Sequence, residues 1–201
     1  MLLISCWIAV GYLSGSLAWG YWIGRYLYGV DIRTKGSGNI GATNAFRVLG
    51  PVPGIFTFIL DVLKGAFPII LMRSIYETNL NQLILISTGF AAILGSKFSI
   101  FLKGRGGKAV NCSFGVILAI MPIEALISLF LWTLVFIITG YVSLASMTAA
   151  IGLPVFLWLL RKDPILIITG FLICAVIITA HKGNIKRLMQ GKENRFNLWK
   201  K

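Results

Sequence analysis

Three short polar segments carry the groups that could do chemistry in this 201-residue chain. The first is residues 36–44, with the sequence GSGNIGATN, and Arg47 follows it closely. Glycine lets backbone N–H groups approach a ligand, and successive N–H groups form a concave site for an anion. Hydroxyl and amide side chains add donors, and an arginine can bind a phosphate through two parallel hydrogen bonds. The segment predicts a phosphate-binding loop; the alternative is a glycine-rich connection between helices.

The second segment, residues 104–108, has the sequence GRGGK and opens an apolar stretch. It differs from a nucleotide-binding P-loop, which needs Gly at the position of Leu102 and Ser or Thr at the position of Ala109. Phosphate binding needs only backbone amides at a helix start and Lys108. We therefore expect an anion site without a nucleotide; the alternative is a basic turn that caps a helix.

The third segment begins at His181, the one histidine of the chain, and continues to Asn184 and a basic cluster. This histidine could bind a phosphate or transfer a proton, or could serve as a structural hydrogen-bonding group. Ser143, in the short connection 140–143, is a candidate donor, nucleophile or helix cap. One histidine and three separated cysteines provide no zinc ligand set, so we expect neither a metal nor a cofactor.

The composition decides which kind of fold must position these segments. Hydrophobic residues make up 57% of the chain and charged residues only 12%, about half the share of a soluble domain. So apolar a chain is not disordered, and its three distant cysteines do not form a disulfide scaffold. We expect an all-α, polytopic membrane helix bundle that forms a single domain over residues 1–201.

Seven apolar stretches predict membrane helices at residues 2–24, 52–72, 83–102, 109–121, 122–138, 144–160 and 165–180. We expect the first to be an uncleaved helix whose Gly11, Gly15, Gly20 and Gly24 allow close packing. A hinge at Met121-Pro122 separates the fourth and fifth helices, since proline is tolerated at a helix start. Asp61 and Lys64 lie three residues apart in the second helix, where they either pair with each other or take part in the function directly.

The basic residues predict the orientation. The formal net charge is +13, and 15 of the 19 Lys and Arg lie in residues 25–50, 97–108 and the tail after His181. Cytoplasmic loops of membrane proteins collect such residues, so the charge does not indicate nucleic acid. Seven helices put all three regions on one side, with the N-terminus outside and the C-terminus in the cytoplasm. The polar segments then converge on a site at the cytoplasmic membrane surface.

These segments, in this order, resemble the bacterial acyl-phosphate:glycerol-3-phosphate acyltransferases, the PlsY type. The resemblance covers essentially the whole chain and extends to Asp61, Lys64-Gly65, Tyr141, Ser143-Leu144, Arg187-Leu188, Gly191 and Glu193. It implies that an acyl chain moves from acyl phosphate to the 1-hydroxyl of glycerol 3-phosphate. The products would be lysophosphatidic acid and phosphate, in the first acylation step of phospholipid synthesis, with no direct use of acyl-CoA.

The resemblance also implies roles for individual residues. The catalytic residues would be Ser143, His181 and Asn184. The substrate-binding residues would be Ser37, Gly38, Asn39, Gly41, Thr43, Asn44, Arg47, Gly104, Gly106, Gly107 and Lys108. Of these, Ser37, Arg47 and Lys108 would bind substrate phosphate, and the amides of 36–44 and 104–107 would hold the acyl phosphate. We expect direct attack by the glycerol hydroxyl, without an acyl-enzyme intermediate.

The same resemblance implies the setting of the protein. Its partners would be glycerol 3-phosphate, acyl phosphate and membrane lipids, with no nucleic acid, and it would be a monomer or a weak oligomer. It would lie in the bacterial inner membrane with its active site at the cytoplasmic face. The alternative is a transporter or binding protein for organic phosphates or phospholipids, but the predicted helices offer few polar groups to line a path.

The chain departs from the family pattern at five positions near the second segment. The family usually continues Gly-Gly-Lys with Gly-Val-Ala-Thr, whereas this chain has Ala109, Asn111 and Cys112. An upstream Gly-His-x-Phe-Pro is here replaced at two positions, by Ser96 and Ser99. We expect these changes to bear on the binding of the donor or the acceptor.

Overall fold

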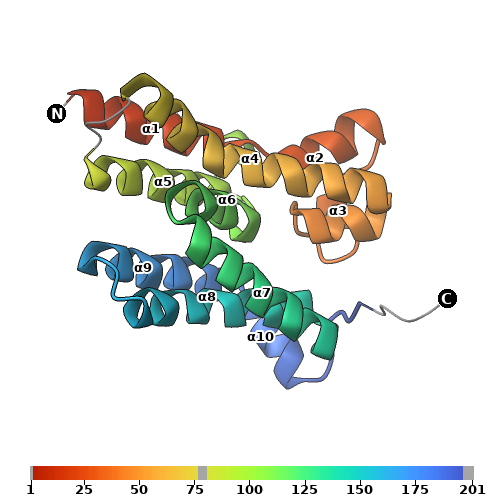
Figure 1. Ribbon diagram of the computed structural model, residues 1–201. Coiled ribbons are helices and arrows are strands. Elements are labelled where there is room, and N and C mark those ends of the chain that lie inside the picture. Colours follow the sequence, from red (N-terminus) through yellow and green to blue (C-terminus); the bar gives the residue numbers. More distant parts are fainter. Residues whose placement is uncertain (1, 77–80, 197–201) are drawn as a thin grey trace. The chain divides into compact units, whose positions relative to one another are not determined.

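The structure, a computed structural model, describes residues 2–76 and 81–196, and its regular elements over these residues are all helical. The helices form two compact units, residues 1–120 and residues 121–201 (Figure 1). The predicted all-α class is therefore confirmed. Each unit is described by itself below.

The described residues of unit 1 form six α-helices and three helical turns of 3-10 or π type. The α-helices are α1 (Leu2–Ser16), α2 (Trp19–Trp22), α3 (Ala42–Leu49), α4 (Pro51–Tyr76), α5 (Gln82–Lys97) and α6 (Val110–Ile120), and the turns are η1 (Ile23–Leu27), η2 (Ile32–Thr34) and η3 (Ile100–Leu102). Helix α1 packs on α5 and α4, and α4 packs on α3 and α6. A Cβ at Gly11 or Gly15 would overlap a backbone carbonyl of α5, and one at Gly20 would overlap the Ile40 carbonyl. The close packing expected of these glycines is confirmed.

The first apolar stretch is not one continuous helix, so that expectation was wrong. Helix α1 ends at Ser16 and α2 begins at Trp19. Side chains from distant parts of the chain bond to the carbonyls at this break: Ser99 Oγ donates to the Ser16 oxygen at 2.5 Å, and Lys64 Nζ of α4 donates to the Leu17 oxygen at 2.8 Å. These distant partners replace the hydrogen bonds that a continuous helix would make.

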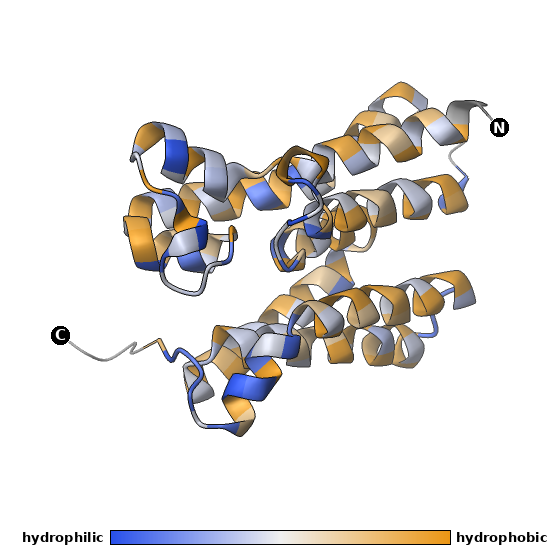
Figure 2. Cartoon of the chain, turned by 180° about the vertical axis from the view of Figure 1, so that it is seen from behind, coloured by the Kyte–Doolittle hydropathy of each residue, from blue (hydrophilic) through white to orange (hydrophobic). Residues whose placement is uncertain are grey.

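Unit 2 contains four helices that follow one another along the chain. They are α7 (Pro122–Thr139), α8 (Val142–Leu159), α9 (Pro164–Ala180) and α10 (Lys182–Met189). Proline begins both α7 and α9, where its missing N–H costs no helical hydrogen bond, so the hinge predicted at Met121-Pro122 is confirmed. Figure 2 shows hydrophilic residues gathered on α10 and the segment after it, whereas α8 and α9 are hydrophobic for most of their length.

Four helical segments of the described residues are long and apolar enough to cross a membrane: Pro51–Tyr76, Gln82–Leu102, Pro122–Thr139 and Val142–Leu159. Helices α9 and α10 add a fifth if the pair, bent by 61°, is one span. Helix α6 is apolar but only 11 residues long, about 16 Å, and Arg73 Nη1 donates to its Ala119 carbonyl at 2.7 Å. The fold is that of a multi-pass membrane protein.

Candidate active site

The first motif, residues 36–44, is a loop shaped around the side chain of Asn44. This side chain is buried; its Nδ2 donates to the carbonyls of Ile32 at 2.8 Å and Asn39 at 2.9 Å, and its Oδ1 accepts from Ser37 N at 2.8 Å. Gly36 packs directly against Asn44 and has a φ of +61°, a conformation that glycine adopts without strain. The amide group of Asn44 therefore holds the loop, and its contact with substrate stays a prediction.

The second motif forms a tight turn in which the backbone amides are already used. The N–H groups donate as follows: Gly104 to Ser99 O at 2.8 Å, Arg105 to Leu102 O at 3.1 Å, Gly106 to Lys97 O at 3.1 Å and Gly107 to Ser96 O at 2.9 Å. The hydrogens of these amides point at carbonyl oxygens within the turn, and the binding of a phosphate by them stays a prediction. A Cβ at Gly106 would collide with two of these carbonyls, so the glycine is needed for the turn itself.

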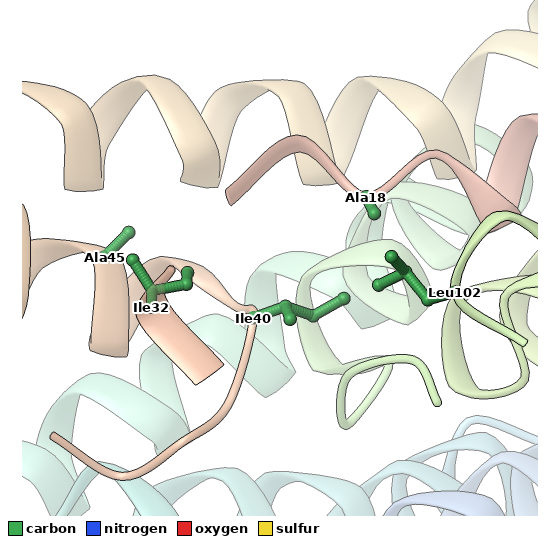
Figure 3. Packing of buried hydrophobic residues seen from close by; sticks show 5 residues of the cluster. All are labelled: Ala18, Ile32, Ile40, Ala45 and Leu102. Carbon is green, nitrogen blue, oxygen red and sulfur yellow. The ribbon is translucent and has the colours of Figure 1, made fainter. Parts of the chain in front are cut away.

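The fold of unit 1 brings the first two motifs together. Ile40 of the first motif and Leu102, just before the second, belong to one buried cluster with Ala18, Ile32 and Ala45, and Figure 3 shows Ile40 directed toward Leu102. A Cβ built on Gly107 would lie 3.7 Å from Asn39 Oδ1. The predicted convergence of these two segments is therefore confirmed within unit 1.

The side chains around the two motifs differ in exposure. Ser37 and Arg47 are exposed, and Thr43 and Lys108 are half-buried. Thr43 and Arg47 lie four residues apart on α3, which places them on one side of that helix. Lys108 directly precedes Ala109, which is buried with a left-handed φ of +60° and leads into α6. These polar side chains stay the candidate phosphate-binding groups of the two motifs.

In unit 2, the carboxylate of Glu193 joins two of the predicted catalytic residues. Ser143 Oγ donates to Glu193 Oε1 at 2.8 Å, and Asn184 Nδ2 donates to the same oxygen at 2.6 Å. Arg187 Nε donates to Oε2 at 2.7 Å. Ser143 is in the first turn of α8 and Asn184 in the first turn of α10, and both are buried. The site thus has a carboxylate at its centre.

The environment of Glu193 keeps its carboxylate ionised. Burial raises the pKa of this group, but hydrogen bonds from Asn184, Ser143 and Arg187, with the charge of Arg187, lower the pKa below its ordinary value of 4.5. Glu193 was not among the functional residues selected from the sequence. The signal was present, because it is the one acidic residue in the basic segment 181–201.

His181 lies where α9 ends and α10 begins, and its side chain is buried. Its Nδ1 is 2.8 Å from the carbonyl oxygen of Ile177. Because a carbonyl oxygen only accepts, Nδ1 carries the hydrogen, and Nε2 is the nitrogen that a neutral imidazole could use as an acceptor. His181 and Asn184 are separated by one turn, so the ring and the amide belong to the same part of unit 2.

Residues 5–191 match the sequence model of a family described as glycerol-3-phosphate acyltransferase. The chain belongs to this acyltransferase family. The glycerol-3-phosphate acyltransferase of Fusobacterium nucleatum is 44% identical over 191 residues, which cover 95% of this chain and 97% of that protein. The one from Geotalea daltonii is 42% identical over 92% of this chain and 93% of its own. The recognition made from the three motifs is confirmed.

Solved structures of the acyltransferase family have the same fold. The crystal structure of PlsY, an integral membrane glycerol 3-phosphate acyltransferase, in its glycerol 3-phosphate form has a TM-score of 0.90 and 38% identity, covering 96% of both chains. Its lysophosphatidic acid form has a TM-score of 0.87 and 37% identity, covering 96% of this chain and 95% of that one. The present acyltransferase is therefore a multi-pass membrane protein, as its apolar helices indicate.

Proposed function

We propose that this protein transfers a fatty acyl chain from acyl phosphate to the 1-hydroxyl of glycerol 3-phosphate. The observation that carries the proposal is the whole-length similarity to a PlsY structure solved in a glycerol 3-phosphate form and a lysophosphatidic acid form. These two molecules are the acceptor and the product of the reaction. The choice of acyl phosphate as donor rests on the resemblance of the three motifs to the acyl-phosphate-dependent acyltransferases.

Exposed and half-buried side chains of the first two motifs suit the binding of substrate phosphate groups. We assign this role to Ser37, Thr43, Arg47 and Lys108. Helix α3 begins at Ala42, and amides in the first turn of a helix have no intrahelical acceptor and favour an anion. The remaining predicted substrate-binding residues, Gly38, Asn39, Gly41, Gly104, Gly106 and Gly107, then shape the loops on which these groups stand.

The hydrogen bonds of Ser143 favour direct displacement. Its hydroxyl hydrogen is donated to Glu193, so the oxygen offers lone pairs that can accept a hydrogen bond from a substrate hydroxyl. The lowered pKa makes Glu193 a poor base for turning Ser143 into a nucleophile. We propose that the 1-hydroxyl oxygen attacks the acyl carbonyl carbon, the carbon–oxygen bond to phosphate breaks, and the departing phosphate takes up the proton. Asn184 and His181 position the reacting groups.

The proposed topology follows from the helices and the charge distribution. With α1 and α6 counted as short membrane-embedded helices beside the five longer segments, the chain has seven spans. The N-terminus would lie outside, and the C-terminus and active site would face the cytoplasm, because the basic residues concentrate there. We propose a single enzyme domain over residues 1–201, acting as a monomer or weak oligomer in a bacterial inner membrane.

The test is acyl transfer by the purified protein in lipid vesicles. Palmitoyl phosphate and glycerol 3-phosphate should give lysophosphatidic acid and phosphate in equal amounts, whereas palmitoyl-CoA should give no product. Lys108→Ala should abolish product, and Lys186→Ala, which removes an exposed lysine of α10, should not. Transfer from palmitoyl-CoA alone would overturn the donor assignment, and an isolable acyl-Ser143 species would overturn direct displacement.

A further inference from the structure

The break in the first span lies inside unit 1, and two side chains from distant parts of the chain bond to the backbone carbonyls at the break. Ser16 is buried, and backbone carbonyls in apolar surroundings cost several kcal/mol when they lack a partner. Ser99 Oγ satisfies the Ser16 carbonyl and Lys64 Nζ satisfies the Leu17 carbonyl. Ser14 Oγ also donates to the Lys64 carbonyl at 2.7 Å. The end of α1 is thus fastened to α4 by bonds in both directions.

Lys64 makes two kinds of contact at once. Its side chain is 4% exposed, and its Nζ lies 2.7 Å from Asp61 Oδ1, on a side chain that is 11% exposed. The expected pairing of these two residues is confirmed, and it neutralises a charge that would otherwise be costly within the membrane. The ammonium has three donors, and one reaches the Leu17 oxygen. Asp61 balances the charge, and the bond to Leu17 is a separate interaction.

The segment beyond the break carries the first motif. Ala18 packs with Ile40 and Leu102 in one buried cluster (Figure 3). Gly20 of α2 approaches the Ile40 carbonyl so closely that a Cβ would overlap it. The path of the chain after the break therefore determines where residues 36–44 pack against the turn that precedes Lys108.

We propose that Lys64 is a positioning residue, which holds residues 36–44 against the turn at 97–108 through its bond to the Leu17 carbonyl. The consequence for catalysis rests on the proposed acyltransferase function. The consequence for the backbone around the break does not, because it follows from the contacts within unit 1 alone.

The test compares Asp61→Asn, Lys64→Met and the double variant. Removing one member of a buried pair leaves an uncompensated charge, whereas replacing both can be nearly neutral for stability. The double variant should therefore melt close to the wild type. It still lacks the bond to Leu17, so hydrogen exchange of the amides in residues 17–40 should be faster. Its kcat/KM should fall by about 100-fold, the loss that a misplacement near 1 Å can produce.

A matched control comes from an ion pair of unit 2 whose carboxylate is buried. Lys162 Nζ lies 2.9 Å from Glu124 Oε1 in unit 2, and the Glu124 side chain is 2% exposed. The double variant Glu124→Gln, Lys162→Met removes the same two charges without touching the break. It should leave both the exchange of residues 17–40 and kcat/KM unchanged.

Two results would overturn the positioning role of Lys64. The first is a Lys64→Met, Asp61→Asn double variant with wild-type exchange at residues 17–40 and wild-type kcat/KM. The second is equal hydrogen exchange of the amides in residues 17–40 in the two single variants. This result applies even if the double variant does not fold. Asp61→Asn retains the bond to Leu17 and should keep these amides protected. A wild-type protein without acyl transfer would refute the proposed function, and the exchange comparison would still decide the role of Lys64.

Discussion

Replacing Glu193 by glutamine should destabilise the protein by an amount that the hydrogen bonds predict. The side chain is 6% exposed and accepts from Ser143, Asn184 and Arg187. Glutamine has the same size but no charge, and only one of its two terminal atoms can accept. If its oxygen faces Ser143 and Asn184, its amino group faces the Arg187 donor.

The magnitude follows from the three contacts. Hydrogen bonds to a charged group contribute about 1.5–3 kcal/mol and neutral ones about 0.5–1.5 kcal/mol. Glu193→Gln would thus weaken the bonds from Ser143 and Asn184 by about 1 kcal/mol each. Arg187 is 38% exposed, so the loss of its ion pair adds less than about 1 kcal/mol. The free energy of unfolding should fall by roughly 2–3 kcal/mol, which corresponds to a Tm lower by roughly 5–10 °C.

The effect should depend on pH in a defined direction. The pKa of Glu193 is lowered in the folded protein, so its stabilisation is fully present above the ordinary value of 4.5 and is lost as the pH falls through the lowered value. The difference in Tm between wild type and Glu193→Gln should be constant from pH 8 to about pH 5. It should shrink below pH 4.5, where the carboxylate takes up a proton first in the unfolded chain and, at the lowered pKa, in the folded protein.

Thermal unfolding in detergent, followed by intrinsic fluorescence across this pH range, measures the effect. Glu124→Gln is the matched control, because it removes a buried carboxylate of the same unit that is paired with Lys162 rather than with Ser143 or Asn184. Glu193→Gln should also lower kcat for acyl transfer, whereas Glu124→Gln should not. Equal Tm values for wild type and Glu193→Gln at pH 7, or a difference that persists unchanged at acid pH, would refute the reasoning.

Three further predictions concern unit 1. Ala109→Gly should stabilise the protein by about 1 kcal/mol in thermal unfolding. Ala109 has a left-handed φ of +60°, which costs an L-residue about 1–2 kcal/mol. Glycine avoids this cost, but it loses more backbone entropy on folding, which offsets part of the gain. Gly106→Ala should abolish acyl transfer, since its Cβ would strike two carbonyls; Gly183→Ala, in helix α10 with ordinary contacts, should remain active. Ser99→Ala should lower the free energy of unfolding by about 1–3 kcal/mol, as it leaves the buried Ser16 carbonyl without its donor; an unchanged Tm would show that another group reaches this carbonyl.

Helix limits set by local chemistry were predictable from the sequence. Pro122 begins a helix in the structure as expected, and the close packing of Gly11 and Gly15 followed from their spacing. The break after Ser16 was not predictable, because the surrounding stretch is apolar and contains no proline. It depends on donors that lie far away in the chain, and residue spacing carries no signal for them.

The same distinction applies to the candidate site. The sequence identified which polar segments matter, and the fold brings the first two together. It could not show which polar groups are already satisfied inside the protein. Asn44 and the amides of residues 104–107 look like ligand donors in the sequence but bond to the backbone. Glu193 belonged to the resemblance without a role of its own, and only the fold places it beside Ser143 and Asn184.

Some helices of unit 1 pack on partners that are made much later in the chain. Helix α1 packs on α5, and α4 packs on α6, whereas α7, α8 and α9 each pack on the next helix in the chain. Lys64 can bond to the Leu17 carbonyl once α4 has been made. Gly65 of the same helix packs against Cys112 of α6, so this contact forms only after α6 has been made. The chain must therefore be synthesised to residue 120 before unit 1 can complete its packing.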